Sequence, residues 1–420
     1  MKKTILILCV LSLMGTVSCI RNLTETEQPI ITLKLGFTTT QTGNNSLVST
    51  RQTNGLNLWI NEINTSGGIL LDNGTTVKFE AVSYDDEGDS DKVEALYKQM
   101  VEEDKVHFLF SPYTSSLTDV AAEIAAAYGK LLITIGAASD ATYSHGYTSV
   151  FQTYTPASRY MTGAVDLLGH LDESSKKIAY VYENSGFSSI VVEAAKNYAE
   201  GLGHETVLLE NYEIGQTDFK SIIDEIIANE ADVVLGGGHF EDGAALAHQL
   251  DTTDVDIDFI ALLVAPPEPE FADLGDAALG VIGPSQWEAT VAFTPESTSD
   301  SGLKWFGPLN DDFIQAYEAA YLEEPSYHSM GGYAAGLILQ KAILDANATS
   351  TAAVVAALNE MDILTCYGRI HFDNSTATHG LQIGHDMVDI QWQKDSSDNL
   401  VKEVVWPPTG KTAEAIYPIP

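Results

Sequence analysis

The feature that most constrains this chain is a regular alternation of short apolar segments with amphipathic helices. Residues 108–140 show the pattern in full. Phe108–Phe110 and Leu131–Ile135 have the composition of buried strands, and an Ala-rich helix lies between them after the hydroxyl-rich segment Ser111–Thr118. Strands separated by helices form parallel sheets with right-handed crossovers. We therefore predict an α/β fold.

The alternation occurs twice, which predicts two doubly wound parallel-sheet lobes. The first lobe is expected to contain residues 31–153 and the second residues 154–283. The later helices and strands are too scattered for a third core, so residues 284–365 are assigned to the first lobe and 366–410 to the second, with 411–420 as a tail. Several chain crossings then form a hinge, and the cleft between lobes is the usual place for a small-molecule site.

The N-terminus has the pattern of an export signal. Residues 1–19 contain two lysines, an apolar run too short to span a bilayer, and small residues before Cys19. The segment ending at Cys19 resembles a bacterial lipobox, although Thr16 stands where Leu is usual; ordinary cleavage between small residues is the alternative. Residues 20–30 are expected to be a flexible tether. We predict a periplasmic or extracellular protein, lipid-anchored through Cys19 to the outer face of the cytoplasmic membrane.

The charge balance excludes one class of partner. The chain has 59 acidic and 21 basic residues, for a formal net charge of -38. Such a surface repels nucleic acid. We therefore expect no nucleic-acid partner.

Two polar loops follow neighbouring predicted strands. They are Ser111–Thr118 and Gly136–Ser139. The carboxyl ends of parallel strands meet at one edge of a sheet, where open α/β sheets bind ligands. A helix start with free N–H groups and hydroxyls suits a carboxylate. The alternative is an ordinary helix cap followed by a glycine turn.

The order of several short motifs resembles a known family, the ABC-transporter substrate-binding proteins of the branched-chain amino-acid (LIV-binding, periplasmic binding protein type I) class. The resemblance covers nearly everything after residue 30. The motifs that carry it are Thr39–Gly43, NEINTSGG at 61–68, YDD at 84–86, FSPYTSSLT at 110–118, ITIGAAS at 133–139, YEIGQTDF at 212–219, GGGHFEDG at 236–243 and GRIHFD at 368–373. The resemblance implies two lobes that close over a ligand about a hinge.

The resemblance also implies a set of first-lobe ligand contacts. In the family, the first loop holds the amino-acid carboxylate through a Ser side chain and backbone N–H groups. Ser115 falls on that position, and the same loop supplies the further candidates Tyr113, Ser116 and Thr118. In the family, the second loop gives a backbone carbonyl to the ligand ammonium and a Thr side chain to the ligand. An ungapped count puts Ala138 on that Thr, a one-residue shift puts Ser139 there, and Ala137 is a further candidate of this loop.

The second-lobe contacts depart further from the family. Phe187 is the candidate for the aromatic residue that closes over the ligand, and His239 or Phe240 replaces a Tyr. The family's acidic residue for the ligand ammonium has no counterpart at the matching place in Leu263–Glu268, so the ligand need not carry a typical amino group. Trp287 is either a cleft residue or part of the hinge packing.

No pattern for catalysis or for a metal is found. His239, Glu241 and His248 fit no common zinc spacing, and no Gly-x-Ser-x-Gly occurs. We therefore expect no cofactor, no metal site and no enzymatic activity. A hydrolase on a related scaffold is kept as an alternative.

The resemblance implies the solute-binding component of an ABC importer. We expect a monomer that binds an amino acid or a similar small carboxylate and delivers it to an ABC permease in the membrane. A ligand-binding domain of a sensory or receptor system with the same fold is the alternative. Replacement of Ser115 by Ala is expected to weaken binding strongly with little loss of stability.

Overall fold

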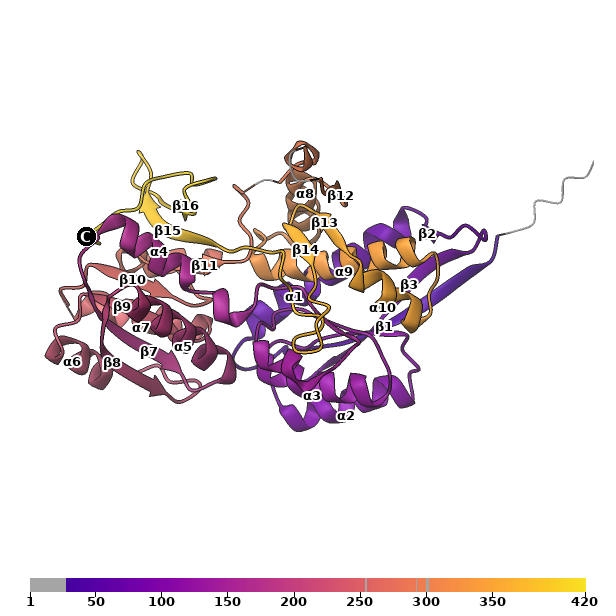
Figure 1. Cartoon of the computed structure of the whole chain (residues 1–420), viewed down its shortest axis with the longest axis horizontal. Helices are drawn as coiled ribbons and strands as arrows, with labels where there is room; N and C mark the ends of the chain where they lie inside the picture. The colour runs from indigo at the N-terminus through magenta and orange to yellow at the C-terminus, as the bar shows by residue number, and fades with distance from the viewer. Residues whose placement is uncertain (1–27, 254, 292, 300–301) are drawn as a thin grey trace, which may run out of the picture.

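The computed structural model describes residues 28–253, 255–291, 293–299 and 302–420. Within these ranges the chain forms two α/β lobes side by side (Figure 1), which confirms the predicted fold class. The predicted signal peptide 1–19, its Cys19 and most of the tether 20–30 lie outside the described residues. Among the described helices, none is long and apolar enough to cross a membrane.

The first lobe is built on a sheet with the order β2-β3-β1-β4-β5-β6, in which only β2 is antiparallel to its neighbour. Its strands are β1 (Ile30–Thr39), β2 (Ile69–Leu70), β3 (Thr76–Asp85), β4 (Phe108–Phe110), β5 (Leu132–Thr134) and β6 (Val150–Gln152). Its first helices are α1 (Ser46–Thr65), α2 (Ser90–Glu102) and α3 (Ser115–Ala127), followed by the 3₁₀ helix η1 (Asp140–His145).

Helices cover both faces of this sheet. Phe108 and Phe110 belong to the core shared with α1, whereas Leu109 between them belongs to the core formed with α2 and α3. Successive side chains of a strand point to opposite faces, so a strand buried on both faces is apolar without interruption. The run Phe-Leu-Phe is therefore explained by the two helical layers.

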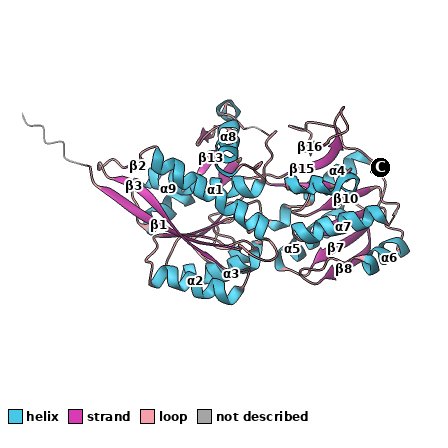
Figure 2. Ribbon diagram, turned by 180° about the vertical axis from the view of Figure 1, so that it is seen from behind, coloured by secondary structure: helices cyan, strands magenta, loops and turns pink. Residues whose placement is uncertain are grey.

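The second lobe has the sheet order β16-β15-β11-β10-β9-β7-β8, with β15 and β16 antiparallel to their neighbours. Its strands are β7 (Lys177–Glu183), β8 (Glu205–Tyr212), β9 (Val233–Gly237), β10 (Phe259–Leu262), β11 (Ile282–Ser285), β15 (Val388–Lys394) and β16 (Leu400–Trp406). Its helices are η2 (Ala157–Arg159), α4 (Thr162–Leu171), α5 (Gly186–Gly201), α6 (Lys220–Ala228), α7 (Phe240–Thr252) and η3 (Pro269–Ala278). Figure 2 shows α4, α5, α6 and α7 beside the strands of this sheet.

The later part of the chain returns to the first lobe before it reaches β15. It contains η4 (Pro295–Thr298), β12 (Lys304–Trp305), α8 (Asn310–Tyr321), α9 (Tyr327–Ala346), α10 (Thr351–Asn359), β13 (Asp362–Leu364) and β14 (Arg369–His371). Helix α9 packs closely on α1: a Cβ added to Gly55 would lie 1.8 Å from the carbonyl oxygen of Ser329. Strands β12, β13 and β14 form a small separate sheet that the sequence did not predict.

The segments that cross between the lobes are tied together by buried polar side chains. The Gln286 side-chain oxygen accepts hydrogen bonds from the backbone N–H of Thr155 at 2.9 Å and from the hydroxyl of Tyr367 at 3.1 Å. Thr155 also contacts Nδ1 of His385 at 2.8 Å. Three crossings are thus linked at one place, which forms the hinge side of the molecule.

Candidate functional site

The lobes meet around a small, mostly aromatic cavity. Its lining comes from both lobes and consists of Tyr113, Ser115, Gly136, Ala138, Tyr154, Tyr160, Phe187, His239, Val264, Tyr327 and His328. Its volume is about 10 Å³, which is room for about one water molecule. No carboxylate, Lys or Arg is found among these described lining residues. In this arrangement the cavity has no room for a molecule much larger than water.

Ser115 begins α3 and faces this cavity. Its hydroxyl oxygen accepts hydrogen bonds from the backbone N–H groups of Ala138 and Ser139, each at 3.2 Å. The first turn of α3 contains no acidic residue, so its positive end is not neutralised by a neighbouring side chain. Ser115 also holds the second loop in place, and the expectation that Ser115→Ala has little effect on stability is therefore revised.

The other first-lobe candidates are exposed, bonded to the local backbone, or part of the cavity lining. Ser116 is exposed and its hydroxyl lies 3.1 Å from that of Thr114. Thr118 donates to the carbonyl of Pro112 at 3.2 Å, and Ser139 accepts from the N–H of Ala141 at 3.3 Å. These two hydroxyls serve the local backbone. Among the described residues, Tyr113, Ser115 and Ala138 line the cavity, whereas the buried Ala137 does not.

Of the second-lobe candidates, some line the cavity and others do not. Phe187 and His239 line the cavity, with their ring centroids 6.2 Å apart. Phe240 is half-buried and packs on the second-lobe core. Trp287 is buried outside the cavity, where its ring N–H donates to Asn310 at 2.8 Å and its ring packs edge-on against Phe313. The structure therefore places Trp287 where the hinge-packing alternative expects it.

Six of the described lining residues were not candidates in the sequence analysis, and four of these lie outside the segments that it named. The four are Tyr154, Tyr160, Tyr327 and His328. Tyr154 follows β6 at the same sheet edge as the two predicted loops, so the strand-end rule would have found it. The hydroxyl of Tyr154 is buried and has no hydrogen-bond partner within the described ranges, so it is available to a ligand. Tyr327 and His328 begin α9, whose position depends on the returning chain.

Two imidazoles line the cavity, and a buried carboxylate lies beside each of them. Nδ1 of His328 lies 2.7 Å from Glu268, and Nδ1 of His239 lies 2.9 Å from Glu183. Burial lowers the pKa of His328, and Glu268 does not fully compensate. Burial also lowers the pKa of His239, but the nearby carboxylates of Glu183, Asp242 and Glu241 outweigh it and raise this pKa above its usual value.

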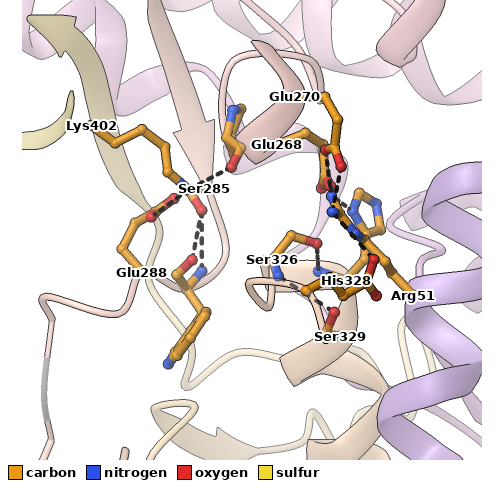
Figure 3. Close-up of polar contacts among 12 residues, drawn as sticks. Arg51, Glu268, Glu270, Ser285, Glu288, Ser326, His328, Ser329 and Lys402 are labelled. Carbon is orange, nitrogen blue, oxygen red and sulfur yellow. Dashed lines mark hydrogen bonds and ion pairs between the residues drawn. The ribbon is translucent and has the colours of Figure 1, made fainter. Parts of the chain in front are cut away.

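Arg51 joins the lobes beside the cavity (Figure 3). It lies on α1 and is 2% exposed, and it contacts Glu268 at 2.5 Å and Glu270 at 2.6 Å, both from the segment after β10 of the other lobe. Glu268 is fully buried between Arg51 and His328. A buried ion pair of this kind fixes one relative arrangement of its elements, because removing either partner leaves an unpaired buried charge.

The negative charge of Glu268 is already neutralised by the protein and is not available to a ligand. Burial raises the pKa of Glu268, but His328 and Arg51 together outweigh burial and lower the pKa to about 2. The carboxylate is thus ionised and compensated by the protein itself. This supports the expectation that the segment Leu263–Glu268 offers no carboxylate to a ligand ammonium.

The cavity contains serine, histidine and nearby carboxylates, but they are not arranged as a nucleophile and its base. The described hydrogen-bond partners of Ser115 Oγ are two backbone amides, and neither imidazole is among them. A serine nucleophile needs a base within hydrogen-bond reach. Ser115 therefore has no such base among its described partners.

A second polar cluster lies behind His239. Glu183, His239 and Asp242 are all buried, and their potential ligand atoms lie within 4.8 Å of one another. Asp242 accepts hydrogen bonds from the backbone N–H of His239 at 2.8 Å and from the hydroxyl of Tyr212. Burial raises the pKa of Asp242. The sequence analysis considered His239 with Glu241 and His248, whereas the fold brings it to Glu183 and Asp242.

Comparison with known proteins gives the family. Residues 32–397 match the family model described as periplasmic binding protein. A leucine-, isoleucine-, valine-, threonine- and alanine-binding protein of Pseudomonas aeruginosa is 24% identical over 371 residues, with 88% of this chain and 92% of that protein covered. The Leu/Ile/Val-binding protein homolog 7 of Brucella melitensis is 23% identical over 371 residues, covering 86% and 89%.

Solved structures show the same fold. The branched-chain amino acid transporter substrate-binding protein LivJ of Streptococcus pneumoniae, in complex with isoleucine, has a TM-score of 0.72 at 20% identity, covering 90% of this chain and all of that one. An ABC transporter solute-binding protein of R. palustris, in complex with benzoate, has a TM-score of 0.71 at 18% identity, covering 92% and 97%.

Proposed function

The chain belongs to the periplasmic binding protein family of type I, and from this premise we propose that it is the extracytoplasmic solute-binding component of an ABC importer. It captures a small carboxylate between its lobes and presents the closed form to a membrane permease. The observation that carries the proposal is the aromatic cavity between the lobes, with Ser115 and the start of α3 on its wall.

The acid end of the solute binds at the start of α3. Helix N-termini favour anions through free N–H groups and the helix dipole, and the first turn of α3 has no acidic residue. The hydroxyls of Ser115 and Tyr154 add two donors at the same cavity. A carboxylate leaving water needs such charge-assisted hydrogen bonds.

The body of the solute lies among aromatic side chains. Tyr113, Tyr154, Tyr160, Phe187 and Tyr327 line the cavity, and flat or apolar groups pack well on such faces. Relatives of the fold bind isoleucine or benzoate. An apolar amino acid or an aromatic carboxylate fits this lining, and the absence of a free carboxylate among the described lining residues favours the aromatic carboxylate.

Binding is coupled to lobe closure. We infer that residues 31–153 move as one body with the returning segment that ends in β14, because β14 pairs with β13. Residues 154–283 move as the other body with β15 and β16, about the crossings joined by Gln286. The cavity is far smaller than any amino acid, so loading and release require opening. A solute that binds between the lobes shifts the population toward the closed form.

The proposal extends to location. We propose that the mature protein is exported and held at the outer face of the cytoplasmic membrane through a lipid on Cys19, and that it acts as a monomer. Metabolic labelling with a palmitate analogue tests the anchor, with Cys19→Ser as the control. Labelling that persists in Cys19→Ser would contradict it.

A thermal-shift panel of paired compounds tests the ligand class. Each acid is compared with its amide, for example benzoate with benzamide and phenylalanine with phenylalaninamide. A ligand at 100 times its dissociation constant adds about 2.7 kcal/mol to the free energy of unfolding. We expect stabilisation by acids only. Equal stabilisation by the amides would exclude the carboxylate site at α3.

A further inference from the structure

A second small cavity adjoins the aromatic one. It has a volume of about 30 Å³, and His239 lines both cavities. The second cavity is lined by residues of both lobes: Asn44 and Asn45 after β1, Glu183 at the end of β7, residues 214–217 after β8, and His239, Glu241 and Asp242 at the start of α7. It is therefore an interlobe site that is separate from the aromatic lining.

The charge of this cavity is strongly negative. Glu183, Glu241 and Asp242 line it, and no Lys or Arg is found among its described lining residues. Three carboxylates in one small cavity repel one another unless a positive charge lies between them. The imidazole of His239 supplies at most one positive charge against these three carboxylates.

Three buried polar atoms at this cavity lack hydrogen-bond partners among the described residues. They are Oε2 of Glu183, Nδ1 of His239 and Oδ1 of Asn45. Glu183 is 3% exposed and His239 is 8% exposed. Glu183 Oε2 and His239 Nδ1 lie 2.9 Å apart and form an ion pair when the imidazole is protonated. Buried polar groups almost always have a partner, and a cation at this cavity would give Asn45 Oδ1 a partner that the ion pair does not supply.

The spacing of these atoms fits the coordination sphere of a metal ion. Neighbouring ligands at about 2.1 Å from an octahedral ion lie about 3 Å from each other. The 2.9 Å between Glu183 Oε2 and His239 Nδ1 matches that spacing as well as an ion pair, and the ligand atoms of Glu183, His239 and Asp242 all lie within 4.8 Å of one another. The donor set of one imidazole with carboxylate and amide oxygens suits Zn²⁺ through its nitrogen and Mn²⁺ through its oxygens.

We propose that Glu183, His239 and Asp242 bind a divalent cation, Mn²⁺ or Zn²⁺, and that Asn45 of the other lobe adds its side-chain oxygen when the lobes close. The backbone N–H of Asn45 already donates across the lobes to Glu241 at 3.2 Å. The cation then favours closure, and by linkage cation and solute strengthen each other's binding.

Titration calorimetry on the full, EDTA-stripped chain with MnCl₂ or ZnCl₂ tests the site without any solute. We expect one saturable site, weakened at least about tenfold by Glu183→Gln, since even outer-shell changes at metal sites cost roughly 10- to 100-fold. Glu213→Gln is the matched control, because it removes the same charge from an exposed side chain of the neighbouring loop. If Glu183→Gln does not fold by circular dichroism, His239→Gln replaces it.

The absence of a saturable site for both ions would overturn the proposal, as would affinity that is unchanged in Glu183→Gln and in His239→Gln. Asn45→Ala is expected to leave cation affinity nearly unchanged without solute and to reduce the gain that solute produces. The cation measurement is independent of the proposed function. Cation binding without any solute binding would support this site and contradict only the importer role.

Discussion

The two lobes present the same local motif to the cleft, a strand followed by a helix N-terminus, but with opposite electrostatics. Helix α3 of the first lobe has no acidic residue in its first turn, whereas α7 of the second lobe has Glu241 and Asp242 there. The start of α3 can thus accept an anion, while the positive end of α7 is already compensated. Equivalent positions in a repeated topology therefore predict a site without predicting the charge of its ligand.

The comparison requires the starts of α3 and α7 to face the same closed cavity. Arg51→Met tests this requirement and has the largest expected effect on solute affinity. Removing one partner of a buried ion pair costs about 3–5 kcal/mol, and Arg51 contacts Glu268 and Glu270 of the other lobe in this arrangement. We expect at least about a 100-fold loss of solute affinity and a lower closed fraction by small-angle scattering.

The matched control is Arg369→Met, which breaks a half-exposed ion pair with Asp362. Such pairs contribute less than about 1 kcal/mol, so solute affinity should be unchanged. If Arg51→Met binds solute as tightly as the unmodified chain, the interlobe ion pair has no part in closure.

Ser115→Ala tests the anion-binding helix end. Loss of a hydrogen bond to a charged group costs about 1.5–3 kcal/mol, so the dissociation constant should rise about 10- to 100-fold. The variant should also unfold more easily, because two amides lose their acceptor. Ser111→Ala is the control: Ser111 Oγ accepts from the N–H of Ile135 at 2.9 Å but does not line the cavity. Ser111→Ala should lower the stability but leave the solute affinity unchanged. Equal affinity losses in both variants would argue against a special role for Ser115.

Asp389→Asn tests a buried carboxyl of the second lobe that, unlike Glu268, has no cation beside it among the described residues. Asp389 is 1% exposed, and burial together with the nearby Asp166 raises its pKa to about 8. The folded state therefore holds a proton that the unfolded state releases, and stability falls as pH rises from about 4 to about 8. Asp389→Asn should raise the melting temperature by at least ~2 °C at pH 8, with little change at pH 4. A gain that is the same at both pH values would show that Asp389 does not titrate as described.

Ser116→Asp makes the start of α3 resemble that of α7 and has the smallest expected effect. A carboxylate in the first turn stabilises a helix by about 0.3–1 kcal/mol, while it repels the carboxylate of the solute. We expect slightly higher stability together with a several-fold weaker affinity, measured by thermal unfolding and calorimetry. Ser116→Asn, which keeps the size without the charge, should lack both effects, and a loss of affinity with Ser116→Asn would assign the effect to shape.

The sequence predicted the parts of the site that lie at strand ends. Ser115 and Ala138 lie in the loops after β4 and β5, and Phe187 and His239 lie after β7 and β9. A parallel sheet places these loops at the cleft, and the family resemblance selected the individual residues within them. Thr118 was a candidate because it flanks Ser115 on the first loop, but its hydroxyl donates to the carbonyl of Pro112. Trp287 was left open between the cleft and hinge packing, and its ring N–H donates to Asn310. A sequence motif cannot distinguish a hydroxyl that faces a cavity from one that satisfies the local backbone.

The sequence by itself determined the α/β class, the repeated lobes and the sheet edge that carries the site, because apolar periodicity and parallel pairing are local and repetitive constraints. Only the tertiary structure decided which charges meet there. Arg51 reaches Glu268 and His328, and Glu183 reaches His239 and Asp242, through chain returns that no local pattern specifies. Burial then sets the ionisation of these groups, since the free energy of a charge depends on its surroundings rather than on its place in the sequence.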